Sequence, residues 1–174
     1  MPATDPIRAL IRDVPDHPRP GIIFKDITPL LGNSAAFRLA CDQMTAPFAG
    51  DGVTHVIAIE SRGFLFGGVI ASTLGAALVP VRKPGKLPAA RSREEYELEY
   101  GTDALEMHSD AIGSGDRALI VDDVLATGGT ASATCRLVAR HGASLAGCAF
   151  LIELSFLSGR EALRGIRVES VLTY

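Results

Sequence analysis

The chain has 174 residues, which suits one domain with a sizeable core and is too short for two ordinary domains. An apolar fraction of 47% and a charged fraction of 21% argue against a disordered or fibrous protein, and no apolar stretch is long enough to cross a bilayer. The net charge of −3 argues against a nucleic-acid-binding protein, whose surface is basic. Charged residues interrupt the N-terminal segment where a secretory signal would be apolar, so we expect a cytoplasmic protein.

The first predicted element is an amphipathic helix over residues 5–14. Pro6 suits its first turn, its apolar residues recur on one face, and the prolines that follow end it. A second helix is expected to begin near Asn33 or Ser34. Either side chain is able to accept a hydrogen bond from the free N–H groups of the first turn.

Beyond residue 50, short apolar strands alternate with helices. This alternation predicts an α/β fold in which helices cover both faces of a mostly parallel sheet. The strands are expected over residues 53–59, 77–81, 118–121, 146–154 and 168–172, and the helices over residues 64–74 and 130–140.

A polar stretch over residues 82–102 breaks this rhythm. It contains two prolines and two glycines, and so long a segment between packed elements is often a functional lid. A solvated hairpin is the simpler interpretation.

The cysteines and histidines give no metal or redox pattern. The three cysteines are far apart in the sequence and lie among apolar or small residues, which predicts buried, inert thiols. The four histidines are equally scattered, so a His-ligated metal centre is not expected. The cysteines are Cys41, Cys135 and Cys148.

The segment over residues 118–130 carries the clearest chemical signal. It reads ALIVDDVLATGGT: an apolar strand, two carboxylates, a turn of small residues and the start of a helix. Ligands of an open α/β sheet bind beyond the carboxyl ends of the strands, and a helix N-terminus favours an anion. Gly128 and Gly129 let the backbone approach a phosphate, and the hydroxyls of Thr127 and Thr130 add donors.

The two adjacent carboxylates, Asp122 and Asp123, would repel a phosphate unless they meet hydroxyl groups or a cation. A ribose diol hydrogen-bonds to carboxylates, and Mg²⁺ mediates between phosphate and carboxylate. The segment therefore predicts a site for a ribose 5-phosphate group. An Asp-capped helix after a glycine-rich turn would explain each residue singly but not their order.

This ordered run resembles the phosphoribosyl pyrophosphate signature of type I phosphoribosyltransferases. The resemblance implies their fold, in which helices flank a central, mostly parallel sheet. It also implies a single domain over residues 1–174, with a small hood over about residues 1–32 and a flexible lid over residues 82–102. Asp122 and Asp123 are implied to approach the ribose hydroxyls, with Mg²⁺ as the cofactor, bound through the substrate near these carboxylates. The implied 5′-phosphate site is Ala126, Thr127, Gly128, Gly129 and Thr130.

Four further segments resemble the adenine phosphoribosyltransferase family, and together they cover most of the chain. The first, PGIIFKDIT over residues 20–28, belongs to the hood. The resemblance implies that Phe24 stacks on the purine while backbone groups of Ile23 and Lys25 read its edge. Family members more often carry Arg in place of Lys25, a change that matters little if only the backbone is used. A weaker match implies that Leu154 closes the back of the base pocket, although its simplest reading is a core leucine.

The second and third segments are ESRGF over residues 60–64 and VRKPGKLP over residues 81–88. The resemblance implies that both bind pyrophosphate and that the peptide before the serine is cis. A guanidinium fork and three cations in five residues suit that anion. The implied pyrophosphate-binding residues are Glu60, Ser61, Arg62, Arg82, Lys83 and Lys86.

The fourth segment, YELEYG over residues 96–101, lies in the polar stretch. The resemblance implies that Glu99 is the catalytic carboxylate, acting with Arg62, and that Tyr100 supports closure of the lid. Other glutamates nearby are expected to be solvated, and only the family pattern distinguishes Glu99 from them.

The resemblance implies a purine salvage enzyme that transfers the 5-phosphoribosyl group from phosphoribosyl pyrophosphate to adenine, giving AMP and pyrophosphate. A xanthine or hypoxanthine/guanine phosphoribosyltransferase stays open, because the donor site is shared and Lys25 could donate to a 6-oxopurine. A non-catalytic regulator that binds phosphoribosyl pyrophosphate is the second alternative. The family also implies a homodimer, with no nucleic-acid or membrane partner.

Overall fold

The computed structural model describes residues 5–97 and 102–174. By their internal packing these residues form two compact units, residues 1–43 and residues 44–174, and each is described by itself.

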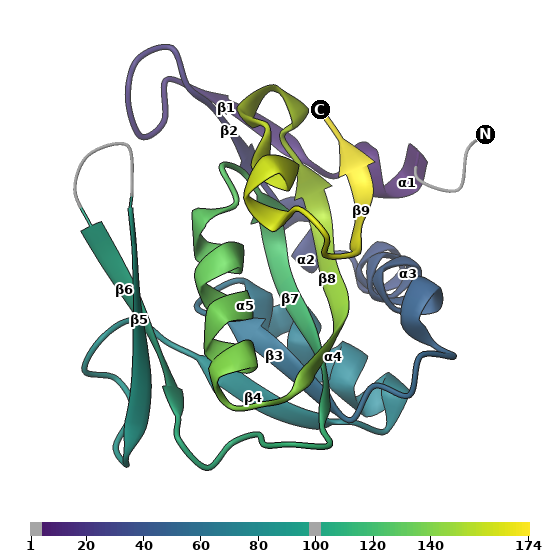
Figure 1. The fold of residues 1–174 in the computed structure, drawn as a ribbon. Coiled ribbons are helices and arrows are strands. Elements are labelled where there is room, and N and C mark those ends of the chain that lie inside the picture. Colours follow the sequence, from purple (N-terminus) through teal and green to yellow (C-terminus); the bar gives the residue numbers. More distant parts are fainter. Residues whose placement is uncertain (1–4, 98–101) are drawn as a thin grey trace. The chain divides into compact units, whose positions relative to one another are not determined.

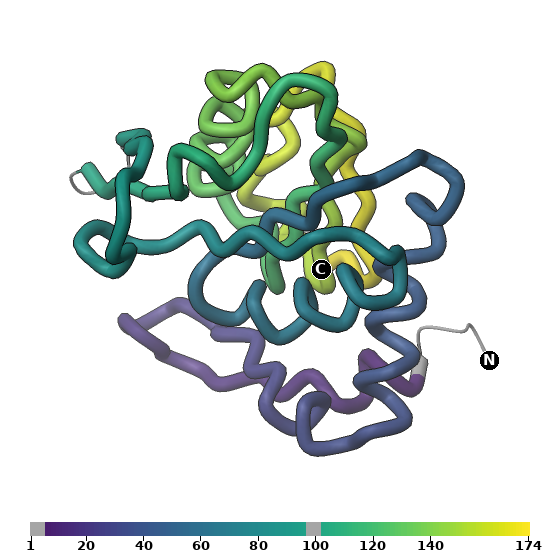
Figure 2. The backbone as a smooth tube through the Cα atoms, turned by 90° about the horizontal axis from the view of Figure 1, so that it is seen from below, coloured from purple at the N-terminus to yellow at the C-terminus, as the bar shows by residue number. Residues whose placement is uncertain are grey.

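The first unit contains a two-stranded antiparallel sheet and three helices. In its sheet Val14 pairs with Phe24 and Asp13 with Lys25, and the two strands run side by side at the purple end of the tube in Figure 2. The elements are α1 (Asp5–Arg8), β1 (Arg12–Pro15), β2 (Ile23–Asp26), α2 (Thr28–Leu31) and α3 (Ser34–Thr45).

The helix predicted over residues 5–14 was largely wrong. The helical turn ends at Arg8, and residues 12–15 form a strand. The reason is long-range: β1 pairs with β2, and Arg12 binds the Asp26 carboxylate across the pair, with 3.0 Å from Nε to Oδ2. Strand pairing with a later segment therefore overrides the local helical pattern.

The next helix begins as predicted. The side chain of Asn33 accepts a hydrogen bond from the N–H of Ala36 at 3.0 Å, and α3 starts at Ser34. Asn33 is thus the capping residue, which satisfies one of the N–H groups that a helix N-terminus leaves free.

The second unit is built on a five-stranded parallel sheet in the order β4-β3-β7-β8-β9. Helix α4 packs against β3, β4 and β7, and α5 packs against β7 and β8. Figure 1 shows α5 in front of the sheet and α4 behind it. The elements are η1 (Ala46–Phe48), β3 (His55–Ile59), α4 (Gly63–Leu74), β4 (Ala77–Val81), β5 (Arg91–Glu97), β6 (Thr102–His108), β7 (Arg117–Leu125), α5 (Gly129–Arg140), β8 (Ser144–Glu153), η2 (Ser155–Leu157), η3 (Gly159–Leu163) and β9 (Val168–Thr173).

The predicted α/β architecture is confirmed, with one boundary corrected. The strand expected over residues 118–121 continues to Leu125, so Asp122 and Asp123 lie inside β7 and not in a loop after it. The continuation is possible because β8 runs alongside: Asp122 pairs with Phe150, and Leu125 with Glu153.

Within the polar stretch over residues 82–102, residues 91–97 form one strand of an antiparallel hairpin, β5 with β6. The described part of this hairpin adds to the core, because Tyr96, Leu105 and Met107 are buried in the same apolar cluster as α5 and the sheet. Glu99 and Tyr100 lie outside the described residues.

The three cysteines are buried and form no disulfide, which confirms the prediction of buried thiols. Burial raises the pKa of the Cys41 thiol to about 11. The fold brings Cys135 and Cys148 together, with their Sγ atoms 3.9 Å apart, although they are distant in the sequence.

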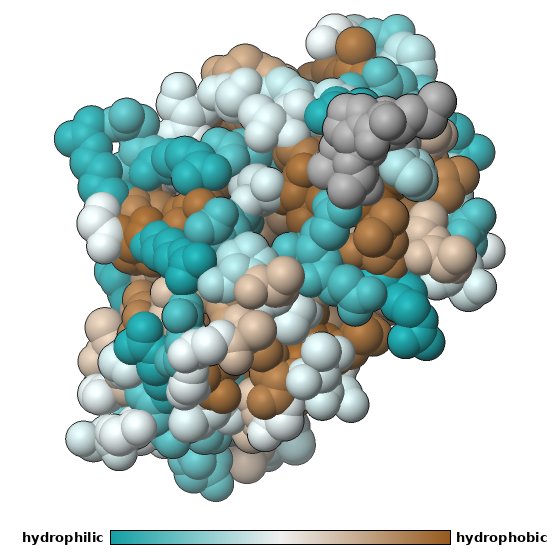
Figure 3. All heavy atoms as spheres, turned by 90° about the vertical axis from the view of Figure 1, so that its right-hand side faces the viewer, coloured by the Kyte–Doolittle hydropathy of each residue, from teal (hydrophilic) through white to brown (hydrophobic). Residues whose placement is uncertain are grey.

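In the described part of the chain, no helix combines the length and apolar character needed to span a bilayer. On the face shown in Figure 3, apolar residues form several groups with hydrophilic residues between the groups.

Candidate active site

Four of the segments singled out in the sequence leave the same edge of the five-stranded sheet. Because the strands are parallel, their carboxyl ends lie together there. Residues 60–62 follow β3, residues 82–86 follow β4, residues 122–130 end β7 and enter α5, and Leu154 follows β8. The chain proceeds outward from β3 to β4 and from β7 to β8, so this edge contains the reversal of strand order at which open α/β sheets bind ligands.

The turn Ala126–Thr130 surrounds a hollow at the start of α5, with a volume of about 70 Å³. No described side chain caps this N-terminus, so its N–H groups remain for an anion. The hollow also contains Asp122, as expected for a ligand that combines a phosphate with hydroxyl groups. Its lining is Asp122, Val124, Leu125, Ala126, Thr127, Gly128, Gly129, Thr130, Ala131 and Phe150.

The turn Ala126–Thr130, the candidate phosphate-binding turn, is covered by η3, a contact that sequence reasoning missed. Gly128 has φ of 82°, and a Cβ there would overlap the carbonyl oxygen of Gly159 and lie 2.9 Å from the Cβ of Ala162. A Cβ at Gly159 would in turn overlap the carbonyl oxygen of Ala126. The two backbones therefore touch because both positions are glycine.

An ion pair holds this cover in place. Arg160 of η3 donates from Nε and Nη2 to the two carboxylate oxygens of Glu153, both at 2.7 Å. This bidentate contact holds the pKa of Glu153 below its ordinary value. Neither Gly159 nor Arg160 belongs to a local motif, so nothing in the sequence indicated them.

The two carboxylates of β7 have different environments. Asp123 is 3% exposed and accepts a hydrogen bond from Nε of Arg62. Asp122 accepts the N–H of Asp123 at 2.9 Å, but burial and the adjacent charge of Asp123 raise its pKa well above the ordinary value. One carboxylate is therefore paired within the protein, and the other is costly to ionise until a ligand or cation reaches it.

Gly63 explains how the Arg62 segment approaches β7. A Cβ at this first residue of α4 would lie 2.7 Å from the carbonyl oxygen of Val121 and 3.0 Å from Oδ1 of Asp122. Only glycine permits this approach, which brings Arg62 to Asp123. The Glu60–Ser61 peptide is cis, as the family resemblance implied.

Glu60 organises the cationic segment after β4. It accepts the N–H of Lys83 at 2.9 Å and Nζ of Lys86 at 2.6 Å, and the guanidinium of Arg82 lies at 3.3 Å. Although burial alone would raise the pKa of Glu60, these hydrogen bonds from Lys86, Lys83 and Arg82 lower it to about 2. One carboxylate thus arranges three residues that are candidates to bind pyrophosphate.

We expect Glu60→Gln to destabilise the protein by roughly 2 kcal/mol, the contribution of hydrogen bonds to a charged group. A lowered pKa means that the stabilisation is complete above the ordinary carboxyl pKa and is lost as the pH falls toward 2. Thermal unfolding of wild type and variant should therefore differ at pH 7 and converge between about pH 5 and pH 2. The control is Glu161→Gln, whose carboxylate pairs with Arg164 but is 64% exposed. A difference that is independent of pH would contradict this account.

Three of the four candidate base-binding residues, Ile23, Phe24 and Lys25, lie in the first unit. Lys25 binds Asp13, with 2.7 Å from Nζ to Oδ1 across the β1–β2 pair. The ring of Phe24 meets His17 edge-on, with ring centroids 5.1 Å apart. In the second unit Leu154 is half-buried at the end of β8, so it is not the core leucine that its sequence context suggests.

The described residues contain no cluster of three or more His, Cys, Asp or Glu side chains arranged to bind a metal ion. Carboxylate oxygens at the site come from Asp122, Asp123 and Glu60. They are hard donors of the kind that Mg²⁺ prefers, and Mg²⁺ is usually held by one or two carboxylates together with substrate phosphates.

Comparison with known proteins agrees with this geometry. Residues 36–165 match the Phosphoribosyl transferase domain family. The adenine phosphoribosyltransferase of Methylococcus capsulatus is 57% identical over 170 residues, 98% of this chain and 99% of that protein. The solved adenine phosphoribosyltransferase of Rhodothermus marinus is 55% identical, with a TM-score of 0.95 over 99% of this chain and 98% of that one.

A more distant structure has the same fold. The Saccharomyces cerevisiae adenine phosphoribosyltransferase, complexed with D-2,5-dideoxy-2,5-imino-altritol 1,6-bisphosphate and adenine, is 37% identical, with a TM-score of 0.92 over 98% of each chain. With a family match over most of its length and relatives above 50% identity across nearly all of it, the chain belongs to the adenine phosphoribosyltransferase family.

Proposed function

We propose that the protein transfers the 5-phosphoribosyl group from phosphoribosyl pyrophosphate to adenine, giving AMP and pyrophosphate. The observation that carries this proposal is the edge of the sheet where a phosphate-binding turn, an acidic pair and a cationic segment lie together. The relatives named adenine phosphoribosyltransferase support the same reaction.

In the proposed complex, the turn Ala126–Thr130 binds the 5′-phosphate and the acidic pair Asp122–Asp123 binds the ribose hydroxyls. The cationic segment 82–86, with Ser61 and Arg62, binds the pyrophosphate. As the C1–O bond to pyrophosphate breaks, negative charge grows on the leaving group and positive charge on the ribose ring. The cations of the site then stabilise the leaving group more strongly than the ground state, which is what lowers the barrier.

Mg²⁺ is the proposed cofactor, bound together with the donor and nearest to Asp122 and Asp123. When bound it supplies charge neutralisation for the pyrophosphate. The raised pKa of Asp122 fits this role, because a cation or a ribose hydroxyl would favour the ionised form that burial and Asp123 disfavour.

The base must lose a ring proton as its nitrogen bonds to C1. We propose that Glu99, which follows β5 in the sequence, accepts this proton, and that Tyr100 supports closure over the substrates. A closed hairpin would exclude water, whose attack on the donor would only hydrolyse it.

The choice of adenine over a 6-oxopurine is supported by the ion pair in the first unit. A 6-oxopurine would benefit from a cationic donor to its exocyclic oxygen, and Lys25 is the candidate for that donor. Its ammonium instead binds Asp13. We therefore propose that the backbone around Phe24 reads the base and that Phe24 stacks on it, and Leu154 stays a separate candidate for contact with the base.

We also propose a homodimer, as the family resemblance implies. Exposed apolar side chains on the second unit support an interface: Leu65 is 45% exposed, Val69 38% and Leu78 47%. Light scattering of the purified protein measures the assembly directly, and a monomer at working concentration would contradict the proposal.

The test of the function is an assay with Mg²⁺, phosphoribosyl pyrophosphate and each purine base separately, followed by chromatography of nucleotide and pyrophosphate. AMP from adenine alone is the expected result. If a nucleotide forms from a 6-oxopurine instead, the proposed donor site still holds, but the specificity for the base would be attributed to Lys25. Binding of the donor without product from any base would indicate a regulator.

A further inference from the structure

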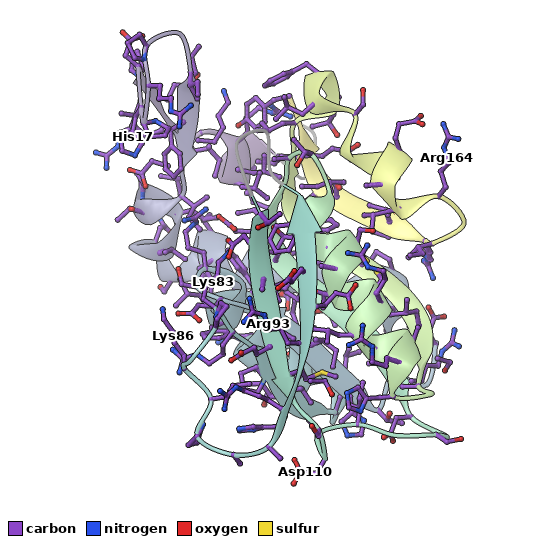
Figure 4. The ribbon with its side chains drawn as sticks, turned by 60° about the vertical axis from the view of Figure 1, so that its left-hand side comes forward. His17, Lys83, Lys86, Arg93, Asp110 and Arg164 are labelled. Carbon is purple, nitrogen blue, oxygen red and sulfur yellow. The ribbon has the colours of Figure 1, made fainter. Side chains whose placement is uncertain are left out.

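Lys83 is the cation of the pyrophosphate segment that does not bind Glu60 through its side chain. Its ammonium extends to the β5–β6 hairpin, where it donates to Oδ2 of Asp103 and, at 2.8 Å, to the hydroxyl of Tyr96. Tyr96 also donates to Asp103 at 3.1 Å, so the three groups close a triangle. Figure 4 shows Lys83 against the strands of the hairpin, and Lys86 farther out on the same segment.

Both partners of Lys83 are themselves fixed. Oδ1 of Asp103 accepts the N–H of Ala104 at 2.7 Å, which orients the carboxylate. Tyr96 is 6% exposed and belongs to the apolar core. An ammonium has three N–H donors, and these two partners take two of them. Among the described residues no hydrogen-bond acceptor takes the third, which we expect to meet a phosphate oxygen.

The hairpin is in turn fastened to α5, the helix that begins at the phosphate-binding turn. Glu94 of β5 binds Arg136, with 2.5 Å from Oε1 to Nε, and it also binds Arg140. Arg136 and Arg140 donate further to backbone carbonyls of β5, those of Glu95 at 3.2 Å and Arg93 at 2.9 Å. A continuous series of ion pairs and hydrogen bonds therefore runs from α5 through β5 to Lys83.

We propose that Asp103 and Tyr96 are positioning residues that set the place of the Lys83 ammonium relative to the phosphate-binding turn, so that one cation meets the pyrophosphate while the turn holds the 5′-phosphate. The proposal rests on the proposed function, because it assigns Lys83 to the pyrophosphate. Although burial alone would lower it, the hydrogen bonds from Lys83 to Asp103 and Tyr96 raise the pKa of Lys83, which keeps the ammonium charged.

The test compares pyrophosphate binding with AMP binding, because the two ligands use different parts of the proposed site. In Asp103→Asn we expect the dissociation constant of pyrophosphate with Mg²⁺, measured by calorimetry, to rise about tenfold, the equivalent of about 1.4 kcal/mol. The dissociation constant of AMP should stay within about twofold, since the phosphate-binding turn and its contacts are unchanged. The KM for phosphoribosyl pyrophosphate should rise in parallel with the pyrophosphate constant.

Three further variants distinguish positioning from a general structural role. Asp103→Glu restores a carboxylate and should recover most of the pyrophosphate affinity, and Tyr96→Phe should lose a smaller part of it. Glu95→Gln is the matched control, because Glu95 lies next to Tyr96 on β5, is 67% exposed and pairs only with Arg93 among the described contacts of its side chain. It should bind both ligands as the wild type does.

The outcomes separate this proposal from the proposed function. Unchanged pyrophosphate binding in Asp103→Asn would overturn the positioning proposal. Tighter binding would also overturn it, because it would show that Asp103 competes with pyrophosphate for Lys83. An equal loss of AMP affinity in Asp103→Asn would overturn the proposal, because it would show that Asp103 has a general structural role. A wild type that binds no pyrophosphate would also overturn it. Calorimetry needs no turnover, so a wild type that binds pyrophosphate but makes no AMP would contradict only the function.

Discussion

Replacing the two adjacent carboxylates singly should change stability in opposite directions while lowering activity in both variants. We expect Asp122→Asn to melt about 3 °C above the wild type at pH 7.5 and Asp123→Asn about 5 °C below it, shifts that correspond to one or two kcal/mol for a chain of this size. In each case kcat/KM for phosphoribosyl pyrophosphate should fall about 100-fold, the effect of removing a group that stabilises developing charge.

The opposite signs follow from the two environments. Burial and the neighbouring charge raise the pKa of Asp122, so its ionised form opposes folding when no ligand is bound. Asn removes that charge and retains an oxygen for the N–H of Asp123, which Asp122 accepts at 2.9 Å. Asp123 is 3% exposed and binds Arg62, so its replacement leaves Arg62 without that carboxylate.

The pH dependence gives a second measurement. For a carboxyl group whose pKa is raised by folding, the contribution to stability is complete below the ordinary pKa near 4 and is lost as the pH rises through the folded-state pKa. The higher melting temperature of Asp122→Asn relative to wild type should therefore be absent near pH 4 and should grow as the pH rises. Melting curves across this range, without ligand, test the sign directly. A variant less stable than wild type at pH 7.5 would show that Asp122 has a stabilising partner.

The succession of strands and helices along the chain, and the small-residue turn before α5, could be predicted from the sequence because their signals are local. Strands such as β4 and β8 are short apolar runs, so their composition alone marks them as strands. The run from Asp122 to Thr130 carries its chemistry in consecutive residues. The predicted end of β7, at residue 121, was wrong. The two carboxylates do not favour a strand by their composition, but pairing with β8 extends the strand to Leu125.

The parts that could not be predicted depend on contacts between distant residues. The pairing of β1 with β2 replaced a helical pattern with a strand. Asp103 and Tyr96 meet Lys83 only after the hairpin forms, and Gly159 meets Gly128 only after η3 folds over the turn. Each of these residues is unremarkable in its own segment, so no local pattern could have indicated it.

Gly128→Ala should cause the second large loss of activity, because two separate constraints act at this position. Its φ of 82° lies in the left-handed region, which costs a non-glycine residue about 1–2 kcal/mol. The added methyl group would also overlap the carbonyl oxygen of Gly159, so the turn or its cover must shift. We expect kcat/KM for the donor to fall at least about 100-fold, because a shift of about 1 Å in the groups that position a substrate is enough for such a loss.

Gly165→Ala separates the two constraints, because Gly165 has nearly the same φ, 80°, and an added Cβ would meet nothing within 4 Å. It should lose stability through backbone strain alone and retain activity. The difference in kcat/KM between the two variants then measures the contact between the turn and η3. Arg160→Ala should act in the same direction as Gly128→Ala but more weakly, because it releases η3 from Glu153 without forcing the turn to move. Equal activity of Gly128→Ala and Gly165→Ala would show that the turn tolerates displacement, and the phosphate would then have to bind elsewhere along the edge of the sheet.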